Sequence, residues 1–132
     1  MSEAAAIPQS VEGAQAVADW FGEWPSFHDA EVLELHLARR GVSWLKLHAW
    51  RRTDEVEADG TFVLDRHAVV SFQLQDVLDL ELADFSGQNV IAGLSIEPGE
   101  RGLRLVLQPC FGLAGYIEAS AISVHLAPGR PT

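Results

Sequence analysis

The side chains best suited to chemistry in this chain are crowded into one short segment near the N-terminus. His28, Asp29 and Glu31 stand almost side by side there. Imidazoles and carboxylates bind divalent metals and act as general acids and bases. A metal site, however, needs ligands from a second element, and no histidine precedes His28. We therefore predict no bound metal, and expect the His28 ring to donate to a nearby carbonyl while Asp29 accepts backbone N–H groups.

The single cysteine is a second candidate for chemistry. A thiol nucleophile needs a base within hydrogen-bond reach, and nothing in the sequence brings His36 or His125 near Cys110. Its neighbours Pro109 and Phe111 favour a small buried hydrophobic residue instead. The chain also lacks a glycine-rich phosphate loop, a G-x-S-x-G turn and an H-E-x-x-H helix. These patterns predict a protein that is not an enzyme and carries no cofactor.

Acidic residues dominate the charge. Nineteen Asp and Glu against nine Lys and Arg give a formal net charge of −10. This sign opposes binding to nucleic acids and anionic membranes and favours a basic protein partner. Two groups of acids are our candidate partner contacts: Asp54, Glu55, Glu57 and Asp59, and then Asp76, Asp79, Glu81 and Asp84. Plain solubility, with the first group on a mobile surface loop, is the alternative explanation.

The elements that position these groups follow from periodicity. A chain of 132 residues that is 48% hydrophobic fits one domain. We expect a flexible arm over residues 1–9, an amphipathic helix over 10–22 that begins at Ser10 and ends at Gly22, strands over 30–126, and a loose tail over 127–132.

The first strand alternates cleanly, so we place Leu33, Leu35 and Leu37 on its core face. A hairpin loop at Gly41 would then set Glu34 opposite Lys46. It would also set His36 opposite Trp44 on a second face, which continues to His48 and Trp50. That face is too apolar for open solvent, so the helix, a second sheet or a partner should cover it.

Later segments also alternate with a period of two. We expect a link at residues 65–67, either a bend or a boundary between two strands at residues 75–76, and a central strand over 90–96, which is apolar on both faces. The prediction is an α+β, strand-dominated fold, with one N-terminal helix and a curved or two-layer antiparallel sheet of roughly seven to eight strands.

We expect no targeting signal and no membrane span. The N-terminus carries an acid where a secretion signal carries bases, and no apolar run approaches the ~20 residues that cross a bilayer. A single cysteine suits a reducing compartment. We therefore expect a cytoplasmic protein that does not bind membranes.

One segment also resembles a known protein family. The run Trp24-Pro25-Ser26-Phe27-His28-Asp29-Ala30-Glu31-Val32 resembles the opening W-x-x-F-H-D-A-E-V motif of the immunity protein 50 family. The segments 85–91 and 108–115 are similar to later family landmarks, although Cys110-Phe111 stands where an aromatic beside the glycine is expected. The resemblance extends from about Trp20 to Val124, but only the first motif is specific.

Members of that family are antidote proteins of bacterial polymorphic toxin systems. The resemblance implies a stoichiometric inhibitor without catalytic residues, in which Trp24, Phe27, His28, Asp29 and Glu31 are structural. We therefore predict an immunity protein that binds a cognate toxin, such as a basic nuclease. The alternatives are a ligand-binding or hydrolytic sheet domain that uses the Trp44, His48 and Trp50 face, and a self-associating module that uses the same face as a homodimer interface.

Overall fold

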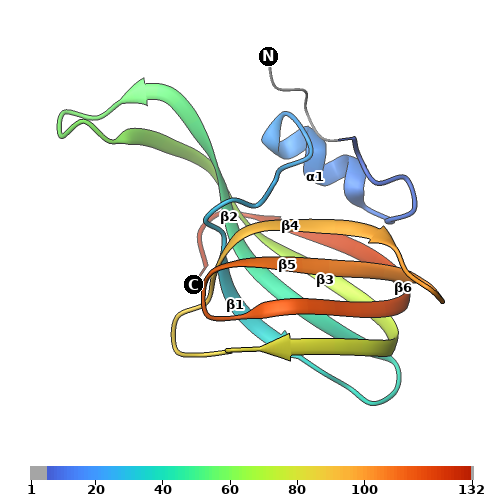
Figure 1. Cartoon of the computed structure of the whole chain (residues 1–132). Helices are drawn as coiled ribbons and strands as arrows, with labels where there is room; N and C mark the ends of the chain where they lie inside the picture. Colours follow the sequence, from blue (N-terminus) through green and yellow to red (C-terminus); the bar gives the residue numbers. More distant parts are fainter. Residues whose placement is uncertain (1–5, 132) are drawn as a thin grey trace.

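Six antiparallel strands form a closed barrel in the computed structural model, which describes residues 6–131, and one helix packs against it (Figure 1). The elements are α1 (Ala14–Phe21), β1 (Glu31–His36), β2 (Val42–Val56), β3 (Phe62–Ala83), β4 (Val90–Pro98), β5 (Leu103–Phe111) and β6 (Ala114–Pro128). The strand order around the barrel is β1-β2-β3-β6-β5-β4. The predicted α+β, strand-dominated class is confirmed, but the predicted strand number of seven to eight is too high.

The strand count differs because β3 is one continuous strand through the predicted link at 65–67 and through residues 75–76, where the predicted bend and not the strand boundary is right. Arg66 and Asp76 absorb the irregularities with left-handed φ values of 54° and 51°. A register shift between Val77 and Asp79 follows the second of them. Asp76 is also tied to the β1–β2 turn, since its N–H donates to the Gly41 carbonyl at 2.9 Å. The polar residues thus bend the strand and do not end it.

The helix is shorter than predicted at its start. Ser10 does not cap it, because the chain first runs beside β6, where Val124 N–H donates to the Glu12 carbonyl at 2.8 Å. Gly13 then turns into α1 with a φ of 90° at a point where any Cβ would overlap the Val124 carbonyl. The predicted end at Gly22 is confirmed. One face of α1 joins the barrel core through Ala14, Val17, Ala18 and Phe21.

Both ends of the described segment, residues 6–131, are more firmly packed than expected. Residues 1–5 and 132 lie outside the described part of the chain, so most of the predicted arm stays untested. Ile7 packs against the core. At the other end Ala127 and Pro128 still pair with β3, and Gly129 N–H donates to the His67 carbonyl at 2.7 Å. The predicted loose tail over 127–132 is therefore wrong at its start.

The hairpin of β1 and β2 has the predicted register, with Glu34 opposite Lys46 and His36 opposite Trp44. The predicted core face of β1 is only partly right. A register shift between Val32 and Glu34 inserts one residue, and Leu33 and Leu37 are exposed while Val32 and Leu35 pack against the core. Leu33 is the inserted residue, so Val32 and Leu35 can both face the core, while Leu37 lies beyond the end of β1.

The barrel interior holds the largest buried side chains. Fully buried residues there include Leu45, Leu47, Val70, Phe72, Leu74, Ile91, Leu105 and Ile117. The predicted central strand over 90–96 forms most of β4, but it lies where the barrel closes. Of its neighbours, β1 pairs with it at a single position, Glu31 opposite Val90.

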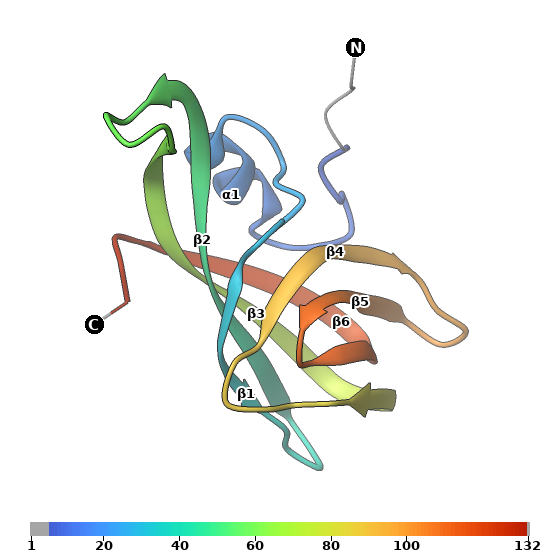
Figure 2. The ribbon, with the colours of Figure 1, turned by 60° about the vertical axis from the view of Figure 1, so that its left-hand side comes forward.

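The strands β2 and β3 extend beyond the barrel. Past Ala49 in β2, and before Ala68 in β3, these two strands pair only with each other. We call residues 51–65 the projecting hairpin; it is the green hairpin that extends away from the barrel in Figure 1, and α1 lies beside its base in Figure 2. In residues 6–131 no helix has the length and apolar character that crossing a membrane requires.

Candidate functional site

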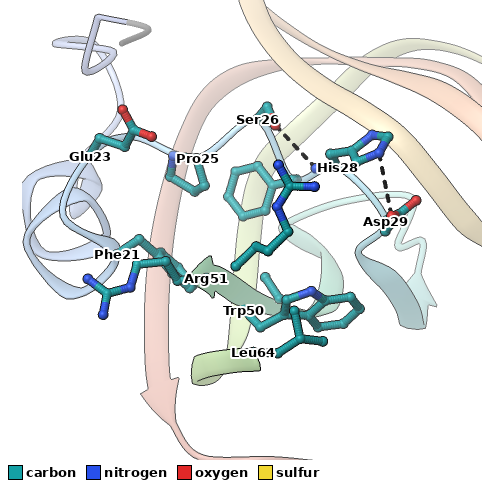
Figure 3. Close-up of a pocket in the computed structure, with 12 residues that line it drawn as sticks. Phe21, Glu23, Pro25, Ser26, His28, Asp29, Trp50, Arg51 and Leu64 are labelled. Carbon is teal, nitrogen blue, oxygen red and sulfur yellow. Dashed lines mark hydrogen bonds and ion pairs between the residues drawn. The ribbon is translucent and has the colours of Figure 1, made fainter. Parts of the chain in front are cut away.

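A cleft of about 690 Å³ lies at the base of the projecting hairpin (Figure 3). One wall is the end of α1 and the segment after it, with Phe21, Glu23 and the run 25–29. The other wall comes from the run 49–52 of β2 and from Leu64 of β3. The cleft therefore brings the His28 motif, whose residues the sequence singled out, against the root of the hairpin.

The motif residues themselves close the barrel. Leu94 N–H donates to the Ser26 carbonyl at 3.1 Å, and Asp29 N–H donates to the Ile91 carbonyl at 2.9 Å. These bonds continue the short pairing of β1 with β4. The segment before β1 thus acts as an extension of that strand along β4, and it supplies main-chain bonds that β1 alone does not.

Trp24 and Phe27 anchor this segment in the core. Both are buried, and their rings pack edge to face with centroids 5.7 Å apart. Phe72 of β3 completes the aromatic cluster, with its centroid 5.6 Å from that of Phe27. Phe27 holds a left-handed φ of 62°, which is unusual for a large side chain. Burial of its ring between two other aromatic rings offsets this backbone strain.

The polar side chains of the motif lie on the surface beside the cleft. His28 Nδ1 is 3.1 Å from the Ala92 carbonyl, and Nδ1 carries the proton because a carbonyl oxygen only accepts. The predicted donation from His28 to a carbonyl is therefore confirmed. Nε2 lies 3.4 Å from Asp29 Oδ2, so Asp29 faces the imidazole and not the backbone N–H groups we expected.

These contacts leave the motif without the geometry of a catalytic triad. Ser26 Oγ accepts the His28 backbone N–H at 3.3 Å, while both ring nitrogens of His28 face other groups. A base must reach the hydroxyl proton of its nucleophile, and this ring is turned elsewhere. No cluster of three potential metal ligands occurs within residues 6–131. Cys110, predicted to be buried, is exposed on β5.

The apolar second face of β2 divides into two groups. His36 stacks on Trp44 with ring centroids 3.9 Å apart, and the Trp44 indole donates to Glu34 Oε1 at 2.7 Å. Glu34 therefore binds this indole and not its predicted partner Lys46. The helix does not cover this face, because α1 contacts β3 and β6. Trp50 is the member of the face that lines the cleft.

The second group on this face is a histidine pair. His48 Nε2 and His67 Nδ1 are 3.0 Å apart and share one proton, and His48 Nδ1 is 3.7 Å from Glu31 Oε1. His67 Nε2 is buried without a partner in the described chain. Burial lowers the pKa of His67, and the nearby positive charge of Arg130 and the His48 ring add to that effect. The neutral form of His67 is therefore favoured.

The eight predicted contact acids are not brought together. The first four lie on the projecting hairpin, and the other four lie on the far half of β3 and the turn after it (Figure 1). Asp59 has a structural role, because its carboxylate accepts from the Thr61 N–H and hydroxyl, which lowers the Asp59 pKa. Asp76 accepts from Gly41 N–H, and Asp79 accepts from the Tyr116 hydroxyl at 2.9 Å.

A buried carboxylate was missed from the sequence. Glu118 on β6 is 1% exposed beneath the β4–β5 turn, and a Cβ on Gly99 would overlap it. Arg101 N–H donates to Oε2 at 2.9 Å, and the Arg104 guanidinium contacts Oε1 at 3.1 Å. These donors lower the Glu118 pKa. In the alternating sequence pattern Glu118 cannot be told apart from exposed acids. It is buried only because the β4–β5 turn folds over it.

The exposed apolar residues of the projecting hairpin were also missed. Val56, Phe62 and Leu64 are 58%, 47% and 41% exposed. The signal was the alternation of 62 and 64 ahead of the polar run 65–67, which separates them from the core residues of β3.

No protein-family model, curated protein or solved structure matches this chain.

Proposed function

We propose that this protein is an immunity protein that binds a cognate bacterial toxin in the cytoplasm and neutralises it without catalysing a reaction. The observation that carries the proposal is the set of carboxylates on the projecting hairpin. Asp54, Glu55 and Glu57 are exposed, and within residues 6–131 none of them forms an ion pair. Unpaired charge on a protruding element is available to a basic partner at little desolvation cost.

The whole-molecule charge supports the same partner. A net charge of −10 produces a field that accelerates encounter with a basic protein and opposes encounter with nucleic acid. Toxins that cut nucleic acids hold phosphates on basic surfaces, so an acidic inhibitor covers such a surface directly. A basic nuclease toxin is therefore the partner class that this charge fits best.

The motif resemblance supports the proposal in a second way. Trp24 and Phe27 are buried, and the segment that contains them closes the barrel. Because such a motif supports the fold, inhibitors of different toxins can share it. Specificity then belongs to exposed residues elsewhere, and the projecting hairpin offers them.

Co-expression with the product of the adjacent gene tests the proposal. We expect the protein to relieve the growth defect that this product causes and to co-purify with it. The triple variant Asp54→Lys, Glu55→Lys, Glu57→Lys should weaken binding tenfold or more and reduce its salt dependence. The control variant Glu12→Lys, Glu97→Lys, Glu100→Lys changes the net charge equally on exposed sites outside the hairpin and outside the candidate contacts, and should bind nearly as the parent does.

Two results would contradict the proposal. A growth defect that the protein leaves unrelieved, without co-purification, would remove the function itself. If both triple variants lost binding equally, binding would depend on net charge alone. The hairpin acids would then not be specific contacts.

Small-ligand binding in the cleft is the second candidate function, favoured by Trp50 on its wall. Native mass spectrometry of the protein purified from its own cells distinguishes the two, because a resident ligand adds a defined mass that Trp50→Leu would remove. Self-association is disfavoured by the like charges of two copies. Light scattering should therefore give the mass of a monomer.

A further inference from the structure

The projecting hairpin has one apolar face. Phe62 and Leu64 are two positions apart on β3, so their side chains point the same way. Arg52 lies opposite Leu64, and Val56 lies opposite Phe62 across the hairpin. Cross-strand partners share a face. The Arg52 guanidinium lies over the Phe62 ring at 4.8 Å, which agrees with this assignment.

This face runs into the cleft at the base of the hairpin. Arg52 and Leu64 belong to the apolar face and also line the cleft. Trp50 follows on the same wall, and Pro25 and Phe27 stand on the other. The exposed apolar residues and the cleft are therefore one continuous surface.

Within the described chain, the projecting hairpin also has open sheet edges on both β2 and β3. Closing a barrel removes edges, but past Ala49 and before Ala68 the outer backbone groups of both strands have no strand beside them. An extended segment of another chain can add to such an edge through main-chain bonds. The backbone and the apolar face thus favour the same kind of occupant.

The charge of the hairpin favours a basic partner over a second copy of this chain. The hairpin holds five carboxylates against Arg51 and Arg52, and Asp65 already neutralises Arg51 through contacts of 2.9 and 2.8 Å. Val56 stands between Glu55 and Glu57. A second copy would bring these acids against its own, which costs free energy. A segment rich in Lys and Arg would instead pair with them.

We propose that the apolar face of the projecting hairpin and the cleft at its base form one docking groove for an extended, basic segment of the partner protein. One apolar side chain of that segment enters the cleft between Trp50 and Phe27, and its flanking Lys or Arg residues meet Asp54, Glu55 and Glu57. The inference rests on the proposed function for the identity of the partner, and it adds where and by what chemistry the partner binds.

The double variant Phe62→Ser, Leu64→Ser tests the groove against the co-purified partner. We expect its affinity to fall about tenfold or more, because anchors in a desolvated groove dominate binding. The matched control is Phe85→Ser, Phe111→Ser, which removes two aromatic side chains that are 61% and 59% exposed elsewhere. It should stay within about twofold of the parent. Amide spectra of barrel residues verify that each variant is folded.

A synthetic peptide separates this inference from the proposed function. The probe is a short extended peptide with one phenylalanine between lysines, and its control has glutamates in place of the lysines. We expect the basic peptide alone to shift the hairpin amide signals and the Trp50 indole signal. If it does so while no toxin is neutralised, the groove stands and the immunity function fails.

The opposite pattern overturns the inference alone. If the toxin is neutralised but the Phe62 and Leu64 variant binds it as the Phe85 and Phe111 variant does, the groove is wrong and the function stands. Shifts that the acidic peptide causes equally would also overturn it, because they would show a groove without the stated charge preference.

Discussion

The two halves of β2 and β3 are built from the same alternating pattern and meet opposite surroundings. Inside the barrel, Leu45 and Phe72 pair across the strands and are 0% exposed. In the projecting hairpin, Val56 and Phe62 also pair across the strands and are about half exposed. The difference lies in what covers them. In the barrel half, β1 and β6 flank the β2–β3 pair, whereas no other strand of the described chain flanks it in the hairpin half.

This contrast separates two uses of apolar residues. Burial of a large side chain stabilises the fold, because apolar surface leaves water. An exposed apolar face gives little stability and keeps that free energy available for a partner. The barrel half should therefore control folding, and the hairpin half should control binding.

The largest expected difference is between two phenylalanines of β3. Phe72→Ala should lower the free energy of unfolding by about 3–5 kcal/mol, because it removes a buried ring and leaves a cavity beside Trp24 and Phe27. Phe62→Ala should change that free energy by about 0.5 kcal/mol or less. Urea titrations followed by tryptophan fluorescence give both values. Equal losses would mean that the hairpin is as much a part of the core as the barrel is.

A smaller effect is expected where the two halves join. The Trp20 indole donates to the Arg66 carbonyl at 2.9 Å, and Arg66 also lies over the Trp20 ring. Trp20→Phe removes the bond and keeps a ring, so we expect a loss of about 1 kcal/mol. Hydrogen exchange of hairpin amides should also become faster. Trp44→Phe, which removes an indole bond on the second face of β2, should leave hairpin exchange unchanged.

Removing the hairpin sharpens the comparison further. Replacement of residues 54–62 by an Asn-Gly turn joins Thr53 to Val63, two residues that the Thr53 hydroxyl already bonds together at 2.8 Å. The free energy of unfolding should change by less than about 1 kcal/mol, since only exposed chain is lost. Partner binding should disappear. A variant that unfolds would show that the hairpin supports the barrel.

The smallest expected effect concerns pH at the root of the hairpin. The pKa of His67 is lowered in the folded protein, so below the ordinary value of about 6.5 the unfolded chain binds a proton that the folded chain resists. Stability should therefore be complete above that pH and fall as the pH is lowered. The groups that face His67 are His48, Asp65 and Arg130.

The variant His67→Gln should flatten this dependence between pH 7 and pH 5, as measured by urea titrations at several pH values. The exposed His125 supplies the control, because His125→Gln leaves the buried pair in place. An unchanged slope in His67→Gln would assign the pH dependence to other groups.

Much of the local structure could be predicted from the sequence. The turn at Gly41 and the register that follows from it were correct, as was the end of the helix at Gly22. Gly at a left-handed position and a period of two are properties of a few consecutive residues. Such signals do not depend on distant parts of the chain.

The site was only partly predictable. The His28 motif was predicted from the sequence to be structural, but its position along β4 and against the hairpin required the fold. Leu33 was misplaced because a bulge is invisible in an alternating pattern. Glu118 was not distinguished because the turn that buries it is distant in sequence.

The sequence by itself determined that this chain forms antiparallel strands with one short helix and a strong negative charge, because alternation, turn residues and ionisable groups act locally. Tertiary structure alone decided which alternating residues are core and which are surface. Closing the barrel covers Leu45 and Phe72 and leaves Val56 and Phe62 outside. Burial is a property of contacts between distant segments, and so the binding surface proposed for this protein becomes visible only once the barrel is closed.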